Sequence, residues 1–93
     1  MALENQYNIK LYPCLNGWVE AVDSGDDGSE IHEKFYVYEK KEGEDLAEDR
    51  LNECKAMKSL LYAVMEELFF YNNKHNAYYL RIHLVDKTEN IVE

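Results

Sequence analysis

The stretch QYNIKLYPCLNGWVEAVD, residues 6–23, carries the clearest fold signal in the N-terminal half of the chain. Apolar and polar residues alternate through 6–15 and again through 18–23, which is the period-two pattern of half-buried strands. Asn16-Gly17 separates the two runs, and this dipeptide is a strong hairpin signal because both residues tolerate positive φ. The stretch therefore predicts a β-hairpin in which Leu15 lies opposite Trp18 and Leu11 lies opposite Val22.

This register divides the hairpin into two faces, because successive side chains of a strand point to opposite sides. One predicted face carries Ile9, Leu11, Leu15, Trp18 and Val22. The other carries Lys10, Tyr12, Cys14, Val19, Ala21 and Asp23. Pro13 lies near the end of the first strand, which indicates an edge position or a bulge.

A third strand is predicted over residues 30–38, EIHEKFYVY, after the turn-rich segment SGDDGS at 24–29. Its alternation places Ile31, Phe35 and Val37 on one face. It places His32, Lys34, Tyr36 and Tyr38 on the other. We expect this second group to share an outer sheet face with Lys10 and Tyr12.

A long helix is predicted from Asp45 to Asn72. Asp45 is a suitable N-cap, and Glu48 follows three residues later as its capping-box partner. Apolar residues then recur at helical spacing through Cys54, Met57, Leu61, Val64, Leu68 and Tyr71. We expect this stripe to pack on the sheet, with Leu61, Val64 and Leu68 in the core.

The segment AYYLRIHLV at 77–85 alternates again and predicts a fourth, C-terminal strand, followed by a flexible tail at 87–93. The order is βββαβ: a three-stranded antiparallel meander, one long helix packed on a sheet face, and the final strand. This is an α+β arrangement, and 1–93 is the length of a single domain. The final strand can lie beside the first strand or the third, since the sequence favours neither.

The formal charge of −9 is concentrated in one half of the chain. Residues 1–53 contain 14 acids and five bases and carry all of it, while residues 54–93 contain five of each. A strongly acidic surface repels nucleic acid and anionic membrane and favours basic partners. We expect neither direct DNA binding nor membrane association. The N-terminus has no secretory pattern, so we expect a cytoplasmic protein with Cys14 and Cys54 as reduced thiols.

No motif of a known catalytic chemistry is present. The acids between Asp23 and Glu30 suggest calcium, but an EF-hand loop that begins at Asp23 would have Gly25 at its third position and Lys34 at its twelfth. Neither histidines nor cysteines show the spacing of a metal site or a nucleophilic triad, and no glycine-rich loop precedes the helix. We therefore expect a protein that is not an enzyme and needs no metal or cofactor.

The leading hypothesis is a small acidic protein that binds, and inhibits, a partner with a basic surface. Such a surface can be one that normally holds nucleic acid, whose phosphates the carboxylates would imitate. The residues expected to carry this contact are Asp26, Asp27, Glu44, Asp45, Glu48 and Asp49.

Two alternatives use the outer sheet face instead. A tyrosine-rich face, or an edge strand, can join copies of the chain into a homodimer or larger assembly. The same aromatic and basic residues can bind a small ligand or single-stranded RNA by stacking. The residues expected on this face are Tyr12, Tyr36, Tyr38, Tyr79, Arg81 and His83.

Overall fold

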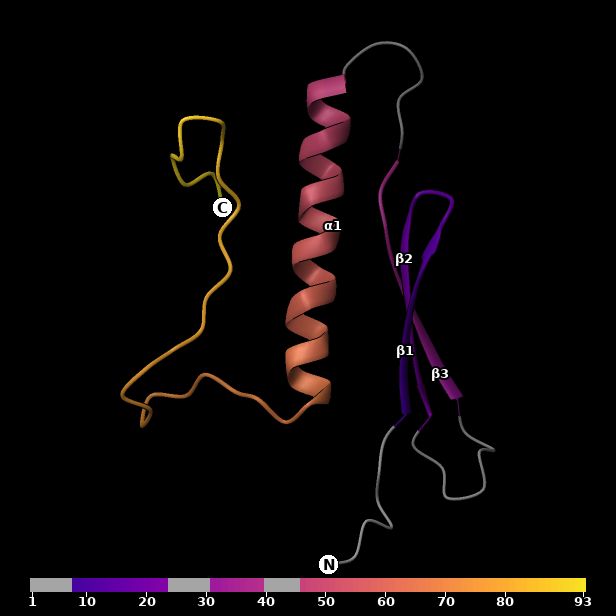
Figure 1. The fold of residues 1–93 in the computed structure, drawn as a ribbon, viewed down its shortest axis with the longest axis vertical. Helices are drawn as coiled ribbons and strands as arrows, with labels where there is room; N and C mark the ends of the chain where they lie inside the picture. Colours follow the sequence, from indigo (N-terminus) through magenta and orange to yellow (C-terminus); the bar gives the residue numbers. More distant parts are fainter. Residues whose placement is uncertain (1–7, 24–30, 40–45) are drawn as a thin grey trace, which may run out of the picture.

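The computed structural model describes residues 8–23, 31–39 and 46–93. Its elements are β1 (Asn8–Cys14), β2 (Gly17–Asp23), β3 (Ile31–Val37) and α1 (Leu46–Glu67). The strands form one antiparallel sheet in the order β1-β2-β3, and α1 runs beside it (Figure 1). The α+β class and the antiparallel meander are confirmed.

The β1–β2 hairpin turns one residue earlier than predicted. Cys14 pairs with Gly17, so the loop is Leu15-Asn16, and Leu11 lies opposite Glu20 rather than Val22. Gly17 belongs to β2, where it pairs with Cys14 and Val37. The β3 backbone passes so close to it that a Cβ at Gly17 would lie 2.1 Å from the carbonyl oxygen of Tyr36. The observed pairing differs from the predicted one by two residues. Because the side-chain period of a strand is two, every hairpin side chain stays on its predicted face.

The β2–β3 register changes the predicted faces of the sheet. Trp18 lies opposite Tyr36 and Glu20 lies opposite Lys34, so Tyr36 shares a face with Trp18. Tyr12 pairs with Val19 and lies on the opposite face. The expected outer face, in which Tyr12 and Tyr36 lie together, is therefore wrong. The reason is that a one-residue difference across the connection between two strands moves a whole strand's side chains to the other face.

Helix α1 packs on the face that carries Trp18, Glu20 and Tyr36. The hydroxyl of Tyr38, just after β3, donates a hydrogen bond of 3.4 Å to Glu53 of the helix. Within the described residues the helix contacts β2 and β3 but not β1. The opposite side of the sheet has no described element over it (Figure 1).

The core is small and lies between β2 and α1. Among the described apolar residues, the buried ones are Val19, Val22, Ala56 and Leu60. Leu60 is 4% exposed, whereas Leu61 is 40% exposed and Leu68 is more exposed still. The prediction that Leu61 and Leu68 belong to the core is wrong, because the side of α1 that meets the sheet is centred on Ala56 and Leu60.

Helix α1 ends at Glu67, five residues before the predicted end. The N–H of Phe70 donates to the carbonyl of Met65 at 2.9 Å, and the N–H of Phe69 donates to Glu66 at 3.0 Å. Phe69 itself has φ of 60°. This is the Schellman arrangement, which satisfies the last helical carbonyls and reverses the chain.

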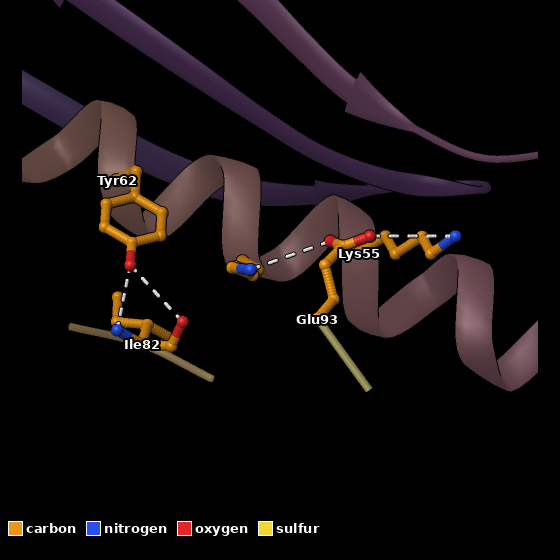
Figure 2. A network of polar contacts seen from close by, with 5 residues as sticks. Lys55, Tyr62, Ile82 and Glu93 are labelled. Atoms are coloured by element: carbon orange, nitrogen blue, oxygen red, sulfur yellow. Dashed lines mark hydrogen bonds and ion pairs between the residues drawn. The ribbon is translucent and has the colours of Figure 1, made fainter. Parts of the chain in front are cut away.

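The C-terminal segment does not form the predicted fourth strand. Residues 77–85 form no strand, and Val85 alone takes part in an isolated bridge; the segment lies along α1 on the side away from the strands (Figure 1). The hydroxyl of Tyr62 accepts a 2.9 Å hydrogen bond from the N–H of Ile82 and donates a 3.3 Å one to its carbonyl (Figure 2). The side-chain amide of Asn72 brackets the N–H and carbonyl of Leu80 in the same way. Side chains thus take the place of a strand partner.

The last residues, where the sequence predicts a flexible tail, fold back toward α1, and their flexibility stays a prediction. A β-bridge joins Val85 to Ile91, and the carboxylate of Asp86 accepts hydrogen bonds from Asn90 and Thr88. These bonds, that from the Asn90 backbone first, hold the pKa of Asp86 below its usual range. The carboxylate of Glu93 then lies between two lysines of α1, 3.8 Å from Lys55 Nζ and 3.7 Å from Lys58 Nζ (Figure 2).

Candidate interaction surface

The acidic residues proposed as a binding surface are only partly visible. Asp26, Asp27, Glu44 and Asp45 lie outside the described residues. Glu48 and Asp49 lie in the first turn of α1, both half-buried, where negative charge is favourable at the positive end of the helix dipole. Stabilisation of the helix is therefore sufficient to explain their placement, and their role in binding stays a prediction.

The aromatic and basic residues proposed as one sheet face are divided among three places. Tyr12 lies on the sheet face away from the helix, while Tyr36 and Tyr38 lie on the helix side. Tyr79, Arg81 and His83 lie in the C-terminal segment, across α1 from the sheet. Arg81 stacks on the ring of Tyr79 at 5.2 Å. These six residues do not form one surface.

The side of the sheet turned away from α1 carries several exposed apolar side chains. We call it the open sheet face. Its described members come from all three strands: Asn8, Lys10, Tyr12, Cys14, Gly17, Val19, Ala21, Asp23, Ile31, Glu33, Phe35 and Val37. Phe35 is 62% exposed and Ile31 60% exposed, although both belong to a strand.

Two ordered rows cross the open sheet face. In one row Tyr12 pairs with Val19, and Val19 pairs with Phe35. Val19 is only 2% exposed, and both of its neighbours in this row are aromatic. The neighbouring row is Lys10, Ala21 and Glu33, and Glu33 accepts a 2.8 Å hydrogen bond from the hydroxyl of Tyr12. One row thus has an aromatic side chain at each end, and the neighbouring row has a positive end and a negative end.

The helix side of the sheet contains an unpaired buried carboxylate. Glu20 is fully buried, and neither of its carboxylate oxygens has a hydrogen-bond partner in the structure. Burial first, and the charge of Glu67 second, raise the pKa of Glu20, while Lys34 opposite it acts in the other direction. A buried carboxylate in such a place favours the neutral form.

Replacing Glu20 by Gln is expected to raise the free energy of unfolding at pH 7 by about 1–3 kcal/mol, because the buried charge is removed. The folded-state pKa of Glu20 lies above its unfolded value. Its contribution to stability is therefore complete below the unfolded pKa and is lost as the pH rises through the folded pKa. Thermal unfolding from pH 4 to pH 8 should show this loss in the natural chain and not in Glu20→Gln.

Glu66→Gln is the matched control, since Glu66 is exposed on α1. It should leave both the melting temperature and its pH dependence nearly unchanged. A Glu20→Gln variant that is less stable than the natural chain at pH 7 would show that the carboxylate has a stabilising partner there.

A pocket of about 400 Å³ lies between α1 and the C-terminal segment. Its walls are mainly apolar, from Trp18, Met57, Leu61 and Ile82, and His83 also lines it. Two cations at its edge are already in ion pairs, Arg50 with Glu53 at 2.8 Å and Lys58 with Glu93. Among the described residues, no group of three or more His, Cys, Asp or Glu side chains could hold a metal ion.

Two further findings concern the class of protein. Within the described ranges, no helix has both the length and the apolar character needed to cross a bilayer. Comparison of the chain with protein families, with characterised proteins and with solved structures gave no match.

The sequence interpretation missed Phe35 as a surface residue and Glu20 as a buried one. A signal for the correct register was present. Glu20 and Lys34 are an opposite-charge pair and Trp18 and Tyr36 are an aromatic pair, and such pairs favour positions directly opposite each other. Aligning β2 and β3 on these two pairs places Phe35 on the open sheet face.

Proposed function

We propose that this chain is a non-enzymatic protein-interaction module that binds through its open sheet face. The observation that carries the proposal is an exposed aromatic and aliphatic surface on the sheet, centred on Phe35 and Tyr12. Apolar patches that are continuous and lie on regular structure mark contact surfaces more often than isolated exposed residues do. Aromatic residues are also enriched at protein interfaces.

The composition of the face fits protein contact better than solvent contact. An antiparallel sheet with one wet face alternates apolar and polar residues so that the outer positions are polar. In β3 the outward positions of the open sheet face are instead Ile31, Phe35 and Val37, with Glu33 between them. Each of the three apolar side chains remains exposed in the isolated chain, so association would remove them from water at a gain of about 25 cal/mol per Å².

Phe35→Ser tests this proposal. The substitution removes the largest exposed apolar side chain of the open sheet face. It is expected to weaken self-association of the chain by about tenfold or more, since aromatic interface residues often contribute more than 1.4 kcal/mol to binding. Sedimentation velocity and size-exclusion chromatography with light scattering measure the effect. The control is Phe70→Ser, because Phe70 has similar exposure but lies after α1, away from the sheet.

The acidic half of the chain supports a second candidate function, binding to a basic partner. The whole net charge of −9 lies in residues 1–53. Two of the acidic residues there, Glu48 and Asp49, are adjacent in the first turn of α1. Binding of this kind weakens as salt is added, because the attraction is screened. Association through the open sheet face persists at high salt, so a titration from 50 mM to 1 M NaCl separates the two candidates.

A further inference from the structure

We infer that the partner of the open sheet face is a second copy of this chain, related by a two-fold axis that runs parallel to the strands. The inference rests on the proposed function and identifies the partner. Three observations lead to it: the exposed apolar side chains of the face, the order of the rows that cross the face, and the positions of its charges.

The exposed side chains of the open sheet face are of the kind that a second copy would cover. Phe35 is 62% exposed, Ile31 60%, Val37 47% and Tyr12 42%. Homodimer interfaces are more apolar than the rest of a protein surface and are enriched in aromatic residues.

The row order makes the open sheet face complementary to itself. A two-fold axis along β2, between two facing sheets, places β1 of one copy over β3 of the other without moving a residue along the strand direction. Tyr12 then lies over Phe35 of the other copy, and Val19 lies over Val19. Facing sheets of a sandwich keep their strands within about 30° of each other, so these central rows stay in contact.

The same operation pairs the charges of the face. Lys10 and Glu33 occupy the two ends of one row, with Ala21 between them. The two-fold axis brings Lys10 of each copy over Glu33 of the other, which gives two equivalent opposite-charge contacts. A two-fold axis perpendicular to the strands and through the Tyr12 row would instead put Lys10 near Cys14 and Glu33 near Val37, so that both charges would face apolar groups, which is unfavourable. Asp23, at the end of β2, stays at the hydrated rim.

Charge exchange tests the arrangement. Lys10→Glu alone gives a chain with two acids at the ends of the row, and Glu33→Lys alone gives a chain with two lysines there. Each variant should self-associate about tenfold to a hundredfold more weakly than the natural chain, because like charges then face each other twice. The doubly substituted chain, Lys10→Glu with Glu33→Lys, should recover the natural affinity.

Mixing the two single variants gives the sharpest result. In a mixed dimer the acids of one chain face the lysines of the other, so the mixture should form a heterodimer that neither variant forms with itself. Native mass spectrometry distinguishes the three species by mass. If a single variant unfolds alone, the same outcome appears as a gain of helical circular dichroism on mixing. Lys74→Glu, which changes the net charge by the same amount as Lys10→Glu but lies away from the sheet, should self-associate like the natural chain.

The outcomes separate this inference from the proposed function. A natural chain that stays monomeric up to millimolar concentration overturns the inference, as does a mixture of single variants without heterodimer. The proposed function survives both results if Phe35→Ser still abolishes binding to another protein. Self-association that is unaffected by Phe35→Ser overturns the proposed function together with the inference.

Discussion

Gly17→Val is expected to lower the free energy of unfolding by about 3 kcal/mol or more, enough to unfold much of the chain at room temperature. Two causes act together. Gly17 has φ of 148°, which a β-branched residue strongly resists. A Cβ there would also lie 2.1 Å from the carbonyl oxygen of Tyr36 and 2.7 Å from the Cα of Val37, both backbone atoms that cannot rotate away. Urea denaturation followed by circular dichroism measures the loss.

The matched control places the same side chain elsewhere in β2. Ala21→Val also introduces a β-branched residue, but Ala21 has an ordinary strand conformation and a half-buried position on the open sheet face. It should remain folded with a change of at most about 1–2 kcal/mol. If Gly17→Val and Ala21→Val are equally stable, then β3 does not pass against Gly17 as described.

Leu60→Ala is expected to lower the free energy of unfolding by about 2–5 kcal/mol, the range for removing a buried leucine side chain. Leu60 is 4% exposed and lies where α1 meets the sheet. The chain has few other buried apolar residues among those described, namely Val19, Val22 and Ala56. The loss is therefore a large part of the total stability of a domain this small. Thermal and urea unfolding at one fixed protein concentration measure it.

Leu61→Ala provides the comparison, because it removes the same atoms from the next residue of the same helix. Leu61 is 40% exposed, so its removal should lower the free energy of unfolding by clearly less than that of Leu60. Both substitutions change helix propensity equally, and the difference between them reports burial alone. A larger loss for Leu61 than for Leu60 would mean that α1 is rotated about its axis relative to the arrangement described.

These two pairs of variants also bear on the proposed dimer. Gly17 and Leu60 hold the sheet and the helix together within one chain, while Phe35, Lys10 and Glu33 face away from the helix. Substitutions in the first group should lower stability at every protein concentration. Substitutions in the second group should lower it most where the dimer would otherwise form, because association stabilises the folded state by mass action.

Local patterns in the sequence were sufficient for the elements themselves. The alternation through 6–23 and 30–38 predicts three strands, and β1, β2 and β3 occupy those ranges. The helical spacing after Asp45 predicts α1, which begins at Leu46. These features depend on side-chain period and on residues a few positions apart. They do not depend on contacts with distant parts of the chain.

The tertiary structure decided which side of each element is buried. The faces of β3 depend on its register against β2, and a difference of one residue moves Phe35 from the inside to the open sheet face. The side of α1 that packs depends on the docking of the helix on β2 and β3. A stripe as wide as the one from Cys54 to Tyr71 leaves that rotation open, so Leu60 rather than Leu61 was found in the core.

The C-terminal segment shows the same limit most clearly. The alternation through 77–85 predicts a strand, because a period of two is the pattern of a half-buried strand. In the structure the segment joins no sheet and lies along α1 instead. The hydroxyl of Tyr62 and the amide of Asn72 bond the backbone groups of Ile82 and Leu80 there, and these side chains satisfy groups that a neighbouring strand would otherwise satisfy. A local pattern shows that a segment could pair in a sheet, but whether it does so is set by contacts between residues far apart in the chain.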